Sequence, residues 1–369
     1  RLKRQNGGRP VPSLMFQHIP VPEIGGLLEE APASAQAEIV APRSRDFVND
    51  AALCAPLEVR EARVEESGDG PVLRCELYNP NEFDAPSAAV TILYRDGEGV
   101  PVVLMNAYPV DHRMWDVCAK ALADFADLND VPDFPIWAPD MAGSGASPVP
   151  SDADSGPRMA NGAYSEALDR LAGAYVDLIK AAGYEQAIWV GLSMGGYVAM
   201  DIQRLYPETV AGLALCDTMA ASDGVGGENR LKMADAAEQT NSVEPVMHFA
   251  QPADGDSTVK KTPEFIATMT GWINEQNPAG LAWRQRMTYG RPELGAVPET
   301  ISAPSLVVSG ELDPSSNPSV MRPLAERITG AEFIDIPDCG HFSAVEHPDT
   351  VARALLSLVK RVQSAQKNA

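Results

Sequence analysis

Short apolar runs alternate with helix-like stretches along most of the chain, starting near residue 72. Apolar runs of about four to eight residues bounded by Gly, Pro or Asp are typical of buried strands, whereas apolar residues three or four apart indicate amphipathic helices. Because the two patterns alternate, we predict an α/β fold with a mostly parallel sheet and helices on both faces. The predicted strands are AVTILYRD (89–96), PVVLMNA (101–107), FPIWAPD (134–140), QAIWVGLS (186–193), VAGLALCD (210–217), PSLVVSGELD (304–313) and AEFIDIPDCGH (331–341).

The segment 219–301 interrupts this alternation, because it contains helix-like stretches and no convincing strand. One of these stretches places apolar residues on a single helical face, which must pack against another surface. Since the segment lies between two predicted strands, we predict a helical cap inserted between a first core part (71–218) and a second (302–369). The helix-like stretches are 228–239, 242–250, 262–276 and 278–290, and the apolar face of the third carries Phe265, Met269, Trp272 and Ile273.

The first seventy residues, 1–70, differ from the rest in being rich in Pro, small residues and charges. This composition predicts an N-terminal appendage that has little structure of its own or packs as a strap. The 369 residues include 29 Lys and Arg and 51 Asp and Glu, which gives a formal net charge of -22. Such a surface repels phosphate backbones and anionic lipids, so we expect neither nucleic acid nor a membrane as a partner.

The five cysteines are scattered singly, and no apolar run approaches the roughly 20 residues of a membrane span. The sequence as given shows no secretory h-region. These features predict a cytoplasmic location. The sequence does not determine the oligomeric state, and it is compatible with a homo-oligomer.

The stretch WVGLSMGGY (189–197) places one hydroxyl, that of Ser193, between glycines directly after an apolar run. Gly-x-Ser-x-Gly between a strand and a helix forms a nucleophile elbow, a turn so sharp that the flanking positions must lack bulky side chains. An apolar helical face follows this motif and ends at Pro207. The alternative, a serine in a glycine-rich turn without chemistry, is disfavoured because both the strand and the helix are correctly placed.

A serine hydroxyl needs a general base, and the base needs an acid that orients it. Of the five histidines, His341 directly follows the last predicted strand, at the edge of the sheet where Ser193 is expected. Asp313 ends the preceding strand, and the order Ser193, Asp313, His341 is the order expected of a nucleophile-elbow hydrolase. Asp217, at the end of a neighbouring strand, is the alternative acid.

An oxyanion that develops during ester cleavage needs two backbone N–H donors. We predict Met194, directly after the nucleophile, and Tyr108, in the loop after the strand at 101–107. Aromatic and methionine residues of the loop and the cap are candidates for an apolar substrate pocket, although most such residues are simply core. The candidates are Trp115, Trp272, Trp283 and Met287.

Five motifs together resemble the α/β-hydrolase family, in particular its esterase, enol-lactonase and haloperoxidase-like group, over residues 90–360. The resemblance implies the α/β-hydrolase fold with a four-helix cap, Ser193 as nucleophile, His341 as base and Asp313 as acid. One departure is Asn106-Ala107, which stands where the family usually has His-Gly. The motifs are VVLMNAYPVDHRMW, PIWAPDMAGSGAS, VGLSMGGYVAM, LVVSGELDP and IPDCGHFSAVEHPD.

These residues predict a serine hydrolase that cleaves small carboxylic esters or lactones through an acyl-enzyme, without a metal or another cofactor. An enol-lactonase is an alternative that would need a cation for a substrate carboxylate, and the cap offers Arg230, Arg284 and Arg286. The same triad also fits a carbon–carbon bond hydrolase, and the same fold fits a non-catalytic protein that binds a small molecule.

Overall fold

In a computed structural model of the chain, residues 97–223 and 227–367 are described, apart from the side chain at 181. The description also includes residues 94 and 95 and the backbone of the strands at 4–6, 9–11, 36–37, 57–67, 70–78 and 91–95. No helix in these parts is long and apolar enough to cross a bilayer.

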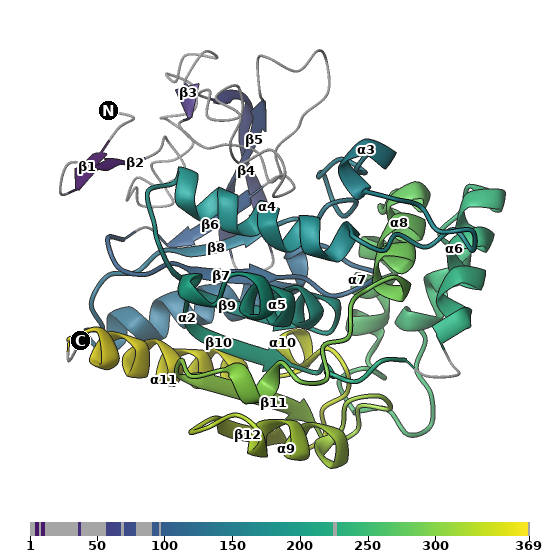
Figure 1. Ribbon diagram of the computed structural model, residues 1–369. Coiled ribbons are helices and arrows are strands. Elements are labelled where there is room, and N and C mark those ends of the chain that lie inside the picture. Colours follow the sequence, from purple (N-terminus) through teal and green to yellow (C-terminus); the bar gives the residue numbers. More distant parts are fainter. Residues whose placement is uncertain are drawn as a thin grey trace.

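Ten of the described strands form one sheet, and the seven predicted strands are all present in it as β6 to β12. Neighbours from β8 to β12 run parallel, whereas β6 pairs antiparallel with β8 and with β5. The predicted α/β fold with a mostly parallel sheet is therefore confirmed (Figure 1). In order across the sheet, the strands are β12 (Glu332–Ile336), β11 (Ser305–Gly310), β10 (Val210–Cys216), β9 (Ala187–Leu192), β7 (Val102–Met105), β8 (Ile136–Pro139), β6 (Thr91–Arg95), β5 (Gly70–Tyr78), β4 (Leu57–Ser67) and β3 (Gln36–Ala37).

The predicted appendage contributes strands where it is described. β4 pairs antiparallel with β5 and so extends the sheet beyond β6, and β3 pairs with β4. A separate hairpin pairs β1 (Arg4–Asn6) with β2 (Arg9–Val11). The rest of 1–70 lies outside the described residues.

Helices cover both faces of the parallel part of the sheet. Across the sheet, the chain moves one way from β7 to β8 and the opposite way from β8 to β9 and on to β10. Because crossovers between parallel strands are right-handed, the helices of these two sets of connections lie on opposite faces. α4 (Ala167–Ala181) and α5 (Met194–Leu205) accordingly pack together on one face, and α2 (Asp116–Leu128) packs with α11 (Pro348–Lys367) on the other. The remaining elements of the core are η4 (His112–Trp115), α3 (Asp152–Ser155), η5 (Pro207–Thr209), α9 (Pro318–Glu326) and α10 (Ser343–Glu346), while η8 (Pro298–Thr300) lies at the end of the segment 219–301.

The central strands are apolar on both faces because both faces are covered. Every residue of β7, β9 and β11 is buried. Their carboxyl ends open into the loops at 106–111, 193 and 311–317, which therefore meet at one edge of the sheet.

The predicted cap segment, 219–301, is helical between β10 and β11. Figure 1 shows its helices gathered beyond one end of the parallel strands, and α6 packs along α8. The apolar face expected in 262–276 is present, since Phe265, Met269 and Ile273 are buried and Trp272 is partly buried. The elements of this segment are α6 (Glu228–Thr240), η7 (Glu244–Ala250), α7 (Pro263–Asn274) and α8 (Pro278–Tyr289).

Candidate active site

Ser193 lies at the turn between β9 and α5 with φ 54° and ψ -112°. A positive φ is strained for any residue with a Cβ, and this strain is typical of a nucleophile elbow. The glycines explain how the turn closes: a Cβ on Gly191 would lie 2.2 Å from the Gly195 carbonyl oxygen, and a Cβ on Gly195 would lie 2.3 Å from the Met105 carbonyl oxygen. The motif therefore lets α5 pack directly against the end of β7.

Ser193, His341 and Asp313, which are far apart in sequence, form one continuous hydrogen-bonded chain. The Ser193 Oγ lies 2.8 Å from His341 Nε2, and His341 Nδ1 lies 2.7 Å from Asp313 Oδ2. Burial lowers the pKa of His341, but the surrounding carboxylates, Asp313 first among them, together outweigh burial and raise this pKa above its ordinary value. The geometry is that of a nucleophile, its base and an orienting acid.

Asp313 is fully buried and is held by the loop that follows it. Its Oδ1 accepts hydrogen bonds from the Ser315 and Ser316 amides and from the Ser315 hydroxyl, and its Oδ2 accepts from the Ser316 hydroxyl. Burial raises the pKa of Asp313, but His341 and these donors outweigh burial and hold the pKa well below its usual range. The carboxylate is thus ionised and fixed toward the imidazole.

The alternative acid, Asp217, has a different position. Its Oδ1 accepts from the Gly310 amide and its Oδ2 from the Ser343 amide, each at 3.0 Å. Burial and the nearby Asp313 raise the pKa of Asp217 to about 7. Asp217 therefore ties the end of β11 to the loop that carries the histidine, while Asp313 is the residue bonded to His341 Nδ1.

Glu346 is a residue of the site that the sequence did not single out. Its carboxylate accepts from the backbone amides of Gly340 and Phe342, one on each side of His341, and from the hydroxyl of Ser257 in the cap segment. The sequence shows a Glu five residues after the histidine, but glutamates are mostly exposed to solvent, so this position did not stand out. In the fold it holds the histidine loop in place.

The candidate oxyanion donors flank the nucleophile. Met194 is the first residue of α5, where a helix leaves its N–H groups free, and Tyr108 lies in the loop after β7, beside the elbow. Within the described parts of the chain, neither amide has a protein acceptor. Ala107, like Tyr108, is buried.

The Asn106 side chain shows how the loop tolerates Asn-Ala in place of His-Gly. Its Nδ2 donates to the Val110 carbonyl at 2.8 Å, and its Oδ1 accepts from the Met141 amide at 2.9 Å. The side chain therefore closes the loop on itself and joins it to the glycine-rich loop after β8.

The four candidate pocket residues lie in packed surroundings. Trp115 and Met287 are fully buried, and the Trp283 indole donates to the Ser155 hydroxyl at 2.8 Å. Trp272 is partly buried, with the Arg113 guanidinium 6.0 Å from its ring centroid. Contact with a substrate stays a prediction for all four.

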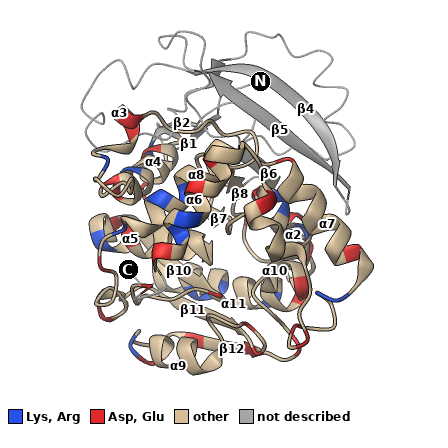
Figure 2. Cartoon of the chain, turned by 90° about the vertical axis from the view of Figure 1, so that its right-hand side faces the viewer, with Lys and Arg blue, Asp and Glu red and all other residues tan. Residues whose placement is uncertain are grey.

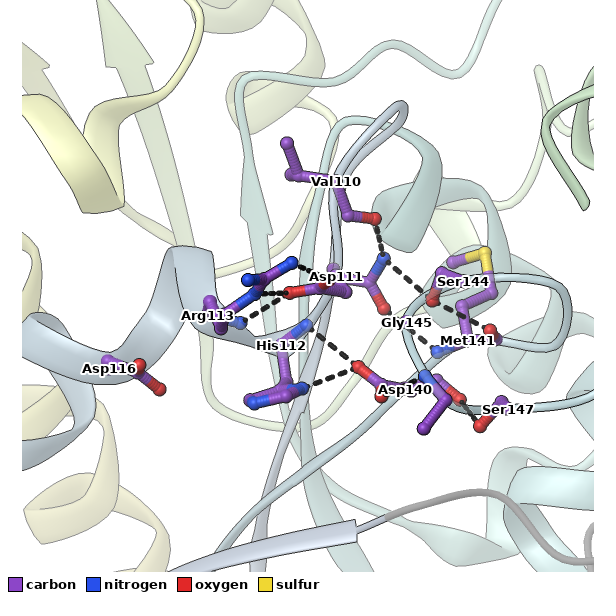
Figure 3. Close-up of polar contacts among 12 residues, drawn as sticks. Val110, Asp111, His112, Arg113, Asp116, Asp140, Met141, Ser144, Gly145 and Ser147 are labelled. Atoms are coloured by element: carbon purple, nitrogen blue, oxygen red, sulfur yellow. Dashed lines mark hydrogen bonds and ion pairs between the residues drawn. The ribbon is translucent and has the colours of Figure 1, made fainter. Parts of the chain in front are cut away.

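Asp111, His112 and Asp140 place three potential metal ligands within 4.8 Å of one another. Their atoms are engaged inside the protein, as Figure 3 shows: His112 Nδ1 lies 2.6 Å from Asp140 Oδ1, and Asp111 forms an ion pair with Arg113. Burial lowers the pKa of His112, but the nearby carboxylates, Asp140 first among them, together outweigh burial and raise this pKa. The three side chains are therefore bonded within the protein at the end of β7 and β8.

The three arginines considered for a substrate carboxylate, Arg230, Arg284 and Arg286, differ in their partners. Arg230 pairs with Asp223, and Arg286 pairs with Glu238. Arg284 is fully buried, and among the described residues it forms no ion pair with a carboxylate. Burial lowers its pKa to about 10, so it is a cation at neutral pH. Figure 2 shows the blue of Lys and Arg concentrated around α6 and α8.

A parallel sheet with a strained serine after a central strand, and a histidine after the last one, defines the class of α/β-hydrolases. The sequence model of the alpha/beta hydrolase family matches residues 102–354, and the chain belongs to this family.

Curated proteins and solved structures agree with this assignment. The chain is 27% identical over 237 residues to lipase LipV of Mycobacterium tuberculosis, and this alignment covers 62% of the chain and 84% of the lipase. It is 25% identical over 232 residues to a poly(3-hydroxyalkanoate) depolymerase of Ectopseudomonas oleovorans, covering 62% and 76%. A thermophilic esterase from Thermogutta terrifontis superposes with a TM-score of 0.62 at 26% identity, covering 82% of this chain and 99% of the esterase. The predicted enzyme class, an α/β-hydrolase similar to carboxylic ester hydrolases, is confirmed.

Proposed function

We propose that this protein is a serine hydrolase that cleaves small carboxylic esters or lactones through an acyl-enzyme. The observation that carries the proposal is the unbroken chain from the Ser193 Oγ through His341 to Asp313, at 2.8 Å and 2.7 Å. This arrangement activates a hydroxyl that is otherwise a weak nucleophile.

In the proposed mechanism, the Ser193 Oγ attacks the ester carbonyl carbon while its proton moves to His341 Nε2. The carbonyl electrons move onto oxygen, and the amides of Met194 and Tyr108 stabilise the resulting oxyanion. The intermediate collapses, the bond to the alcohol oxygen breaks, and His341 gives that oxygen its proton. Water then attacks the acyl carbon with the same base, which releases the acid and restores Ser193. Asp313 holds the imidazole tautomer and balances its charge throughout.

Two further observations favour esters or lactones. The similar proteins include one named as an esterase and one named as a lipase. Among the arginines of the cap segment, Arg286 pairs with Asp235 and Glu238, and Arg230 shares Asp223 with Arg291. Arg284 donates to the Val110 carbonyl and to Gln276. Cations committed in this way favour a neutral substrate over the carboxylated substrate of an enol-lactonase.

The test is turnover of short p-nitrophenyl esters and simple lactones by the wild type, Ser193→Ala and Ser364→Ala. Ser364 is exposed on α11 and serves as a matched serine control. We expect turnover and fluorophosphonate labelling in the wild type and in the control, and neither in Ser193→Ala. Folded wild type with no turnover and no labelling would contradict the proposal and favour the non-catalytic binding protein.

A further inference from the structure

The loop that carries the candidate oxyanion donor is held from two sides. On the core side, the Asn106 amide donates to the Val110 carbonyl at 2.8 Å. On the cap side, Arg284 Nη1 of α8 donates to the same carbonyl at 2.9 Å, and its guanidinium lies 5.1 Å from the Tyr108 ring centroid. One buried cap side chain thus contacts the residues on both sides of Pro109, through the Val110 carbonyl and the Tyr108 ring.

A second cap residue, Gln276, extends this contact. Its Oε1 accepts from Arg284 Nη2 at 3.2 Å and from the Gly145 amide at 3.2 Å, and its Nε2 donates to Asp111 Oδ2 at 2.8 Å. Gln276 and Arg284 therefore join the cap to the two loops that support the predicted oxyanion hole.

We propose that Arg284 is a positioning residue that fixes the Tyr108 amide from the cap side, so that correct seating of the cap sets the strength of the oxyanion hole. This inference rests on the proposed function, since it assigns a role in stabilising the transition state of ester cleavage.

The burial of Arg284 carries a free-energy cost that needs an explanation. Burying a guanidinium without a carboxylate partner is costly, and its hydrogen bonds to Val110 and Gln276 offset only part of that cost. Arg286, two residues further along α8, shows the ordinary solution, because it pairs with Asp235 and Glu238. The position of Arg284 is therefore best explained by what it does for the loop.

The expected magnitude follows from what is lost. Removing an oxyanion donor costs about 10²–10³ in kcat. Truncating Arg284 leaves the Tyr108 amide present but held only from the core side, so we expect a loss in kcat of about 10- to 100-fold.

The experiment compares Arg284→Met and Arg284→Lys with Arg286→Met, a control on the same helix that does not contact the loop. It measures kcat and KM for a p-nitrophenyl ester, and the affinity for an aryl trifluoromethyl ketone, which forms a tetrahedral oxyanion on the serine. For Arg284→Met we expect kcat and ketone affinity to fall by the same factor with KM nearly unchanged, because only transition-state binding is lost. We expect Arg284→Lys to recover part of both, and Arg286→Met to resemble the wild type.

Unchanged kcat and ketone affinity in folded Arg284→Met would overturn the inference, and so would a raised KM at constant kcat, which would make Arg284 a substrate-binding group. If Arg284→Met does not fold, Gln276→Met is measured instead and is expected to show a smaller parallel loss in kcat and ketone affinity. The absence of this loss overturns the inference as well. A folded wild type without turnover would instead overturn the proposed function itself, so the two failures are distinguishable.

Discussion

Replacing Asp313 with Asn tests the assignment of the acid more sharply than removing the side chain. Asn keeps the size of Asp313 but has one acceptor oxygen and one NH₂ group. Asp313 Oδ1 accepts from three donors supplied by Ser315 and Ser316, whereas Oδ2 faces the His341 Nδ1 and the Ser316 hydroxyl. The Asn oxygen is therefore expected to take the Oδ1 position and its NH₂ group to face the imidazole.

An NH₂ group at that place forces His341 Nδ1 to accept, so the ring proton moves to Nε2. The imidazole then cannot take the proton of Ser193, whose Oγ lies 2.8 Å away. A triad held in the wrong tautomer loses about 10⁴ in kcat, and at about 1.4 kcal/mol per tenfold this is about 5 kcal/mol of the activation barrier.

The matched variant is Asp217→Asn, which changes the alternative acid in the same way. Asp217 accepts two backbone N–H groups, so an Asn leaves one of them opposite its own NH₂. We expect a loss in stability of about 1–3 kcal/mol and a fall in kcat of at most about tenfold. Both variants are assayed for kcat on a p-nitrophenyl ester and for thermal unfolding. A severe loss of kcat in Asp217→Asn together with a mild one in Asp313→Asn would refute the assignment.

Three further substitutions follow from the packing around the site. In Gly191→Ala, the new Cβ would lie 2.2 Å from the Gly195 carbonyl oxygen, so the elbow must shift and we expect kcat to fall at least about 10²-fold in an ester assay. Gly280→Ala would place a Cβ 2.0 Å from a carbonyl oxygen of the glycine-rich loop, and we expect a loss of about 1–3 kcal/mol in thermal unfolding, whereas an unchanged melting temperature would contradict this packing. Burial lowers the pKa of His341 while the surrounding carboxylates, Glu346 among them, raise it. Since the imidazole must be neutral to act as a base, kcat/KM is expected to rise with pH through the pKa of His341. Glu346→Gln removes one of the charges that raise this pKa, so the rise in kcat/KM should move to lower pH. A pH profile that does not move would contradict this role of Glu346.

Local patterns were sufficient to predict the seven strands β6 to β12 and the elbow, but the strands β1 to β5 were not predicted. One short stretch contains the strand before Ser193, the glycines around it and the apolar helical face after it. Within such a stretch, the period of the apolar residues indicates whether the chain forms a strand or a helix. One detail differed in the cap segment: within the stretch 242–250, the structure has the 3₁₀ helix η7 (Glu244–Ala250), with Pro245 in its first turn.

The supports of the site could not be predicted in the same way, because they depend on which loops the fold brings together. Gln276 and Asp111 are separated by 165 positions in sequence, and Glu346 reaches Ser257 across 89. A buried Gln or Glu has no local pattern that distinguishes it from a solvated one. Only the assembled fold shows that these side chains fix the loops of the predicted oxyanion hole and of His341.

The most direct test of the central claim, a serine made nucleophilic by His341, is to trap the acyl-enzyme. Wild type and Ser193→Ala are mixed with p-nitrophenyl acetate, quenched in acid within the first turnover, digested and analysed by mass spectrometry. We expect one acetyl group on the wild-type peptide that contains Ser193 and none on the corresponding peptide of the variant. Ester turnover without acetylation of Ser193, or equal turnover by Ser193→Ala, would contradict the account.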